Sequence, residues 1–97
     1  FVKTQRIYSF KAIIRSGTSI GALIRESEHA ESNADFIHKF AIAQKECNET
    51  LYWLELLYKT EYILQNEYES MNNDNTELLK MITTTIKTCK SKRTSKN

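Results

Sequence analysis

The segment SNADFIHKFAIAQKECNETLYWLELLYKT, residues 32–60, decides the fold, because it contains neither glycine nor proline and has the pattern of one long helix. Its apolar or small residues follow one another at steps of three and four, which places them on one face of an α-helix. They are Phe36, Phe40, Ala43, Cys47, Thr50, Leu54 and Leu57. Ser32 followed by Asp35 is similar to a capping box and marks the start. At about 1.5 Å per residue the helix is roughly 40 Å long, and its apolar face requires partner helices on both sides.

A second amphipathic helix is predicted upstream, over about residues 4–29. Its stripe keeps the same spacing through Ile7, Phe10, Ile14, Gly17, Ile20, Gly21 and Ile24. Because the period continues through both glycines, we predict one helix in which the glycines mark close packing against a neighbour. A helix broken near Gly17 is the alternative.

A third helix is predicted over about residues 67–90, opened by Asn66 and Glu69 in a second capping pattern. Residues 71–75, MNNDN, are poor helix formers, so its first part is expected to fray or kink. The connections between the three segments are short, which favours antiparallel neighbours. Residues 91–97 are expected to form a flexible basic tail.

The composition describes one globular domain over residues 1–97. Hydrophobic residues make up 40% and charged residues 27%, with no proline and two glycines, which excludes an all-β fold. No apolar run approaches the roughly 20 residues of a membrane span, and no signal segment precedes the first helical pattern. We therefore expect a soluble, cytoplasmic protein with no membrane partner.

The two cysteines, Cys47 and Cys89, both lie on apolar helical stripes, where a free thiol behaves as a small hydrophobic group. We interpret them as reduced core residues. Neither His29 nor His38 is spaced with a cysteine in a metal-binding pattern. No metal ion and no cofactor are expected.

Positive charge is concentrated at both ends of the chain. Residues 1–25 contain five lysines and arginines and residues 87–97 another five, with no acid in either segment. Such clusters favour contact with nucleic-acid phosphates. The alternative is an ordinary solvated surface, since the net charge is only +2. The candidate nucleic-acid-binding residues are Lys11, Arg15, Arg25, Lys87, Lys90, Lys92 and Arg93.

Catalytic residues are not recognised. Glu46 and Glu49 lie mid-helix without a nucleophile, a histidine or a glycine-rich loop, so we interpret them as partners in bundle salt bridges. Arg15 and Glu49 are predicted to pair, within the bundle or across a subunit interface; the alternative leaves Arg15 on the basic face. Trp53 and its neighbouring tyrosines are interpreted as core or interface residues, although aromatic rings can also stack on bases.

RSGTSIGALIRE at residues 15–26 and DFIHKFAIAQKECNETLYWLELL at residues 35–57 resemble the protein family encoded in intervening sequences of bacterial large-subunit (23S) ribosomal RNA. The likeness extends through LLKMITTTIKT, residues 78–88, and so covers nearly the whole chain. Two positions depart from the family pattern: Leu23 stands where Asn is common, and Arg25 where an acid is common.

This resemblance implies an all-α, antiparallel up-down four-helix bundle that assembles as a ring, a pentamer, and has no enzymatic activity. Three helices are visible in this chain, so the first family helix is expected upstream of Phe1 or from another molecule. A related branch of the family serves as accessory proteins of diversity-generating retroelements. The sequence thus predicts a non-enzymatic homo-oligomer that binds ribosomal RNA or another nucleic acid, with no small-molecule substrate. A protein–protein adaptor, such as a reverse-transcriptase accessory protein, is the alternative.

Overall fold

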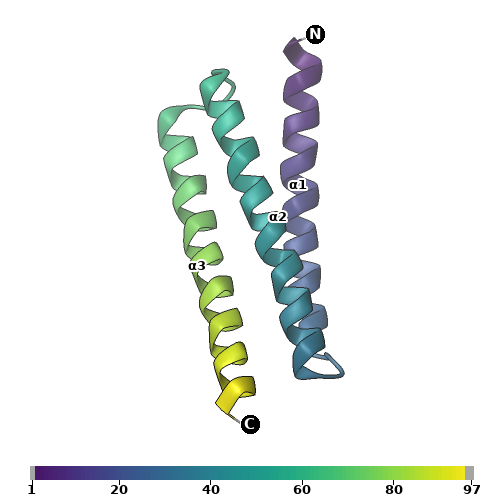
Figure 1. Cartoon of the computed structure of the whole chain (residues 1–97). Helices are drawn as coiled ribbons and strands as arrows, with labels where there is room; N and C mark the ends of the chain where they lie inside the picture. The colour runs from purple at the N-terminus through teal and green to yellow at the C-terminus, as the bar shows by residue number, and fades with distance from the viewer. Residues whose placement is uncertain (1, 96–97) are drawn as a thin grey trace.

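The computed structural model consists of three long α-helices (Figure 1). They are α1 (Val2–Ser27), α2 (Asn33–Lys59) and α3 (Gln65–Ser95). The structure describes the backbone of residues 2–95 and the surroundings of the side chains of residues 10–92. No strand occurs within this backbone range, which confirms the all-α prediction.

The helix α2 lies between the other two. In Figure 1 the chain runs down α1, returns along α2 and runs down again along α3. Contacts join α2 to α1 and to α3, whereas no Cα atoms of α1 and α3 approach within 8 Å in the described backbone. The molecule measures 54 × 21 × 15 Å and is therefore elongated and flat.

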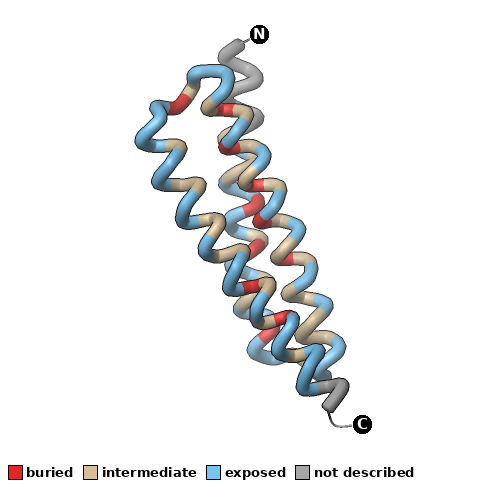
Figure 2. Tube along the Cα trace, turned by 60° about the vertical axis from the view of Figure 1, so that its left-hand side comes forward, coloured by how far each residue is buried: buried red, intermediate tan, exposed pale blue. Residues whose placement is uncertain are grey.

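One side of α2 supplies the centre of the core, as the spacing predicted. Figure 2 shows the buried positions along the sides that the helices turn toward one another. The buried residues of α2 are Ala43, Cys47, Thr50, Leu54 and Leu57. Phe36 and Phe40, at the start of the same stripe, are half-buried and stack with ring centroids 4.6 Å apart.

The core has two parts along the helices. The first joins all three helices through Ile20, Ala43, Cys47, Ile82 and Ile86. The second lies at the α2–α3 connection and contains Leu54, Leu57 and Ile63. Beside it the rings of Tyr58 and Tyr68 stack at 4.6 Å, almost parallel. Burial of these side chains provides the main force that holds the helices together.

Both ends of α2 are fixed by hydrogen bonds. At the start, Ser32 Oγ accepts from the Asp35 N–H at 3.1 Å, which confirms the predicted cap. At the end, the Tyr62 N–H donates to the Leu57 carbonyl at 2.9 Å and the Glu61 N–H to the Tyr58 carbonyl at 3.0 Å. This is a Schellman arrangement, and Glu61 occupies its left-handed position with φ 65°.

The limits of α3 differ from the prediction at both ends. Asn66 is not the cap; instead Glu67 Oε1 accepts from the Leu64 N–H at 2.8 Å, so the helix begins at Gln65. Residues 71–75 form regular helix, within which Asn75 Nδ2 donates to the Met71 carbonyl. At the other end the helix includes residues 91–95 of the expected tail, and residues 96–97 lie outside the described backbone.

The helix α1 is continuous through Gly17 and Gly21, as predicted, but neither α2 nor α3 packs closely against these glycines. Both are exposed, and a Cβ atom added at either would meet nothing within 4 Å. Close packing against a further helix stays a prediction. Ile14 is 67% exposed, whereas Ser16 and Ile20 are buried. The buried stripe of α1 is thus rotated from the one that the apolar residues predicted, because small serines also fit against α2.

Both cysteines are free thiols, as predicted. Cys47 is fully buried, Cys89 half-buried. The Cys47 thiol donates to the Asn75 carbonyl at 3.3 Å and thereby links α2 to α3. Burial raises the pKa of the Cys47 thiol, because the thiolate would lose its hydration.

Candidate nucleic-acid interface

The three predicted binding residues of α1 are all exposed. Lys11, Arg15 and Arg25 lie on the same outward side of the helix as the exposed Thr18 and Ala22. Lys11 and Arg15 are one turn apart, whereas Arg25 lies roughly 21 Å from Lys11 along the axis. The structure therefore places these cations in a row along α1 and does not gather them into one patch.

The predicted cations of α3 lie near its last turns. Lys87, Lys90 and Lys92 are exposed, and the side chain of Arg93 lies outside the described residues. This part of α3 is close to the start of α2, because Asn33 Nδ2 donates to the Cys89 carbonyl at 3.4 Å. The cations of α3 thus share one end of the molecule with the end of α1 (Figure 1).

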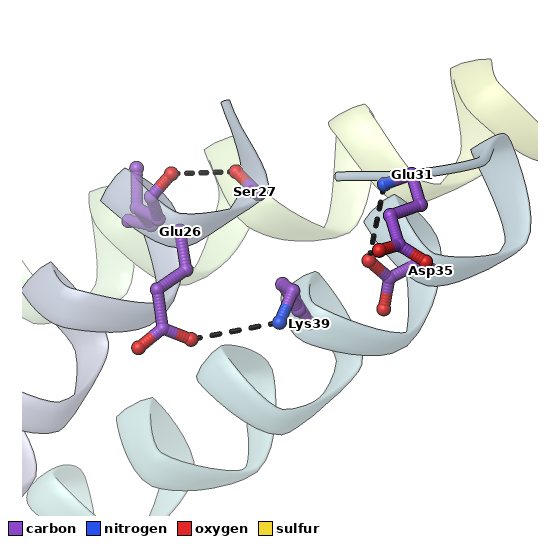
Figure 3. A network of polar contacts seen from close by, with 6 residues as sticks. Glu26, Ser27, Glu31, Asp35 and Lys39 are labelled. Atoms are coloured by element: carbon purple, nitrogen blue, oxygen red, sulfur yellow. Dashed lines mark hydrogen bonds and ion pairs between the residues drawn. The ribbon is translucent and has the colours of Figure 1, made fainter. Parts of the chain in front are cut away.

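That end also carries acidic side chains, as Figure 3 shows. Lys39 Nζ lies 3.5 Å from Glu26 Oε2 and ties α2 to the last turn of α1. Asp35 Oδ2 accepts from the Glu31 N–H at 3.4 Å. These carboxylates partly offset the field of Arg25 and of the lysines of α3, so this end has mixed charge.

An open groove of about 660 Å³ runs along the outward side of α2, with Arg15 of α1 among its lining residues. We call it the α2 groove. Its lining residues are Arg15, Ala41, Gln44, Lys45, Asn48, Glu49, Tyr52 and Trp53. The α1 contribution is Arg15, the only predicted binding residue in this lining. Tyr52 is 59% exposed and makes an edge contact with Trp53, with ring centroids 5.2 Å apart.

Arg15 and Glu49 both line the α2 groove but form no ion pair with each other. The described residues show ion pairs at Lys39–Glu26 and Lys59–Glu55. The described residues therefore show neither the predicted pairing within the bundle nor salt bridges at Glu46 and Glu49. The physical reason is that both Arg15 and Glu49 can remain hydrated in an open groove, where an ion pair adds little. The pairing across a subunit interface stays a prediction.

Two buried polar atoms have no hydrogen-bond partner among the described residues. They are Ser16 Oγ, in a fully buried side chain, and Glu46 Oε2, in a half-buried one. The hydroxyl of Thr50, one turn further along α2, donates to the backbone carbonyl of Glu46 at 3.0 Å. Buried polar atoms are normally paired, so these two atoms are exceptions within the described residues.

Sequence reasoning identified the individual aromatic and charged residues but not the groove that gathers them. A signal was present: Ala41, Lys45, Asn48 and Tyr52 are spaced by four, three and four residues and so share one outward face of α2. The spacing within α2 could not predict that Arg15 lies beside this face, because its position depends on how α1 packs against α2.

The described residues form neither a candidate metal site nor a candidate membrane span. Within the described residues, no three histidine, cysteine or acidic side chains are close enough together to hold a metal ion. None of the helices within residues 2–95 combines the length and apolar character needed to cross a membrane.

The fold and the groove define an all-α protein of long packed helices with an open polar groove on its surface. The family model described as 23S rRNA-intervening sequence protein matches residues 1–84, and the chain belongs to this family. This confirms the resemblance seen in the sequence.

A solved structure from Bacteroides thetaiotaomicron, described as a protein with unknown function from the S23 ribosomal protein family, is similar to this chain. The two are 62% identical and superpose with a TM-score of 0.79. The match covers 81% of this chain and 70% of that chain. No curated protein matches this chain.

Proposed function

We propose that this chain is a non-enzymatic RNA-binding protein and that ribosomal RNA is its leading ligand. The observation that carries the proposal is the segregation of charge, because both terminal segments contain cations and no acids. The candidate cations that the structure describes are all exposed on α1 and α3. Exposed cations of this kind neutralise phosphates. Membership of a family described by an rRNA intervening sequence supports the same ligand.

The absence of catalytic activity belongs to this proposal. The lining of the α2 groove includes neither serine, cysteine nor histidine, the side chains that most often act as nucleophile or general base. Glu49 lines the groove without such a partner. A protein that holds RNA without cleaving it needs only shape, charge and stacking surfaces.

The same proposal includes a fourth helix that packs against the three described helices. Ile14 of α1 and Met81 of α3 are each 67% exposed, and the three helices leave the molecule flat. Large exposed apolar side chains of this kind favour a further helix, upstream of Phe1 or from another molecule, in an antiparallel four-helix bundle. Assembly into a homo-oligomer, a pentameric ring, follows from the family resemblance.

The second candidate function is a protein–protein adaptor, such as a reverse-transcriptase accessory protein. The exposed apolar residues favour it, and so do Tyr52, Trp53 and Arg15 of the α2 groove, because tyrosine, tryptophan and arginine are enriched at protein interfaces. The two functions respond differently to salt. Phosphate contacts weaken steeply as salt rises, whereas apolar protein contacts change little.

The test is the salt dependence of RNA affinity, measured by fluorescence anisotropy with a labelled ribosomal RNA fragment. If about five phosphates are neutralised, affinity should fall about 100-fold between about 50 and 200 mM salt. Replacing Lys87 and Lys90 together by Gln should lower the slope, while Lys80→Gln, an exposed lysine outside the candidate set, should leave it unchanged. No measurable RNA binding at low salt would reject this function in favour of the adaptor.

A further inference from the structure

We infer that the α2 groove binds unstacked bases of single-stranded RNA, with the Tyr52 ring inserted between two successive bases. This inference rests on the proposed RNA-binding function and specifies the form of RNA and the surface that receives it. It assigns base contact to the middle of α2, away from the predicted cations of α3.

Tyr52 has the position that such an insertion requires. It lines the α2 groove on one side and, on the other, a second hollow of about 190 Å³ formed with Glu55, Leu56 and Lys59. With 59% of its surface exposed, the ring is open toward both hollows. Trp53 contacts the Tyr52 ring in a T-shaped arrangement, with an interplanar angle of 70°. The exposed surface of the ring is available for stacking.

The cations of the two hollows are not equivalent. Arg15 and Lys45 in the α2 groove form no ion pair in the described structure, so they can receive phosphates. Lys59 in the second hollow is held by Glu55 at 2.8 Å. The hydrogen bond to Glu55 and its negative charge raise the pKa of Lys59. The strand therefore places its phosphates against Arg15 and Lys45.

Polar side chains of the α2 groove face the bases. The Asn48 side-chain amide makes no hydrogen bond within the described residues, so both its donor and its acceptor are available. Gln44 already donates to Thr83 Oγ1 at 2.9 Å. Glu49 can only accept, and a carboxylate in a groove for RNA pairs with the amino groups of bases. The site should therefore prefer bases with an exocyclic amino group to uracil.

These features select single strands. In a duplex the bases are stacked and paired, so neither an inserted ring nor Asn48 and Glu49 could reach them; loops and single strands leave both faces and edges open. From Ala41 to Lys59 the two hollows extend roughly 27 Å along α2, which is long enough for several nucleotides.

The test uses Trp53, the only tryptophan of the chain, as an intrinsic probe. The full chain is titrated at low salt with a single-stranded RNA oligonucleotide of mixed sequence and with the same oligonucleotide annealed to its complement. We expect the single strand to quench Trp53 emission and to bind at least about tenfold more tightly than the duplex, as loss of one stacked base predicts. Tyr52→Ala should lower single-strand affinity about tenfold, and Tyr52→Phe should retain it.

A second comparison tests whether RNA binds in the α2 groove or only responds to the total positive charge. Lys45→Gln should lower the affinity, and Lys80→Gln is its matched control, since both lysines are exposed and only Lys45 lines the groove. Circular dichroism and the mass in solution are measured for each variant. If RNA binds with a steep salt dependence but Tyr52→Ala and Lys45→Gln leave it unchanged, the groove inference is overturned and the proposed function stands. If the chain binds no RNA, both fail. If Tyr52→Ala instead lowers the mass of the assembly, the groove is a contact between proteins and the inference is also overturned.

Discussion

The helices α1 and α2 have 26 and 27 residues and share the same apolar spacing, yet they bury different kinds of side chain. In α2 the apolar stripe is buried where it was predicted, through Leu54 and Leu57. In α1 the buried positions include Ser16 and Ser27, while Ile14 remains 67% exposed.

The difference follows from the number of neighbours. Backbone contacts join α2 to helices on both sides, whereas within the described backbone α1 contacts α2 alone. A helix with two neighbours covers most of its apolar stripe, and in α2 only the half-buried Phe36 and Phe40 of the predicted stripe are less than fully covered. A helix with one neighbour covers the part that faces it, and the rest of its apolar residues stay open for another partner.

The largest predicted effect is the contrast between Leu54→Ala and Ile14→Ala in this 97-residue chain. Leu54 is 1% exposed, so its truncation should lower the free energy of unfolding by about 2 to 5 kcal/mol. Ile14→Ala should change it by less than about 0.5 kcal/mol, because the side chain is largely in water already. Urea denaturation measures both. An equally large loss for Ile14→Ala would mean that the open side of α1 is covered by another molecule in solution.

A smaller effect should distinguish Cys47, in the buried stripe of α2, from the half-buried Cys89. Since burial raises the pKa of Cys47 in the folded protein, unfolding releases its proton at high pH. The contribution of the protonated Cys47 thiol to the free energy of unfolding is complete below the pKa that the thiol has in the unfolded chain. It is lost as pH rises above that value, about 8.5. The slope cannot exceed about 1.4 kcal/mol per pH unit for one thiol.

The measurement is urea denaturation across this pH range, with Cys47→Ala as the variant in which the slope should disappear. Cys89→Ala is the control and should keep it. Labelling with a thiol reagent at neutral pH should modify Cys89 before Cys47. Rapid labelling of Cys47 in the folded chain would contradict the burial on which this prediction rests.

The sequence allowed much of the fold to be predicted, because the information lies within single helices. The absence of glycine and proline and the Ser32 cap located α2, and the period located its core. The phase of α1 was predicted wrongly because spacing identifies a stripe but not the side on which the neighbours lie. The start of α3 was missed because Glu67 caps Leu64 through its side chain, a pattern without the usual N-cap residue.

Less of the candidate site could be predicted. The exposed cations Lys11 and Arg25 follow from the helical period, as does the exposure of Lys87. The α2 groove combines residues of two helices, and no spacing within one helix places Arg15 beside Tyr52. The same limit applies to the predicted pair of Arg15 and Glu49: both residues line the α2 groove, but no spacing within a helix shows that this groove is open to water.

The smallest predicted effect concerns the open side of α1 itself. Gly17 lies in the helix interior with no atom near its missing Cβ, so Gly17→Ala should raise the free energy of unfolding of this chain by about 0.5 to 1 kcal/mol. For a domain of this size that corresponds to a rise in Tm of about 2 to 8 °C, measurable by thermal denaturation, and Gly21→Ala should behave in the same way.

A longer form of the protein that supplies a further helix provides the informative contrast. If that helix packs against this side of α1, the added methyl groups must fit beneath it, and the gain should shrink or become a loss. An equal gain in both forms would show that the glycines face water in the completed bundle, and that the additional helix packs elsewhere.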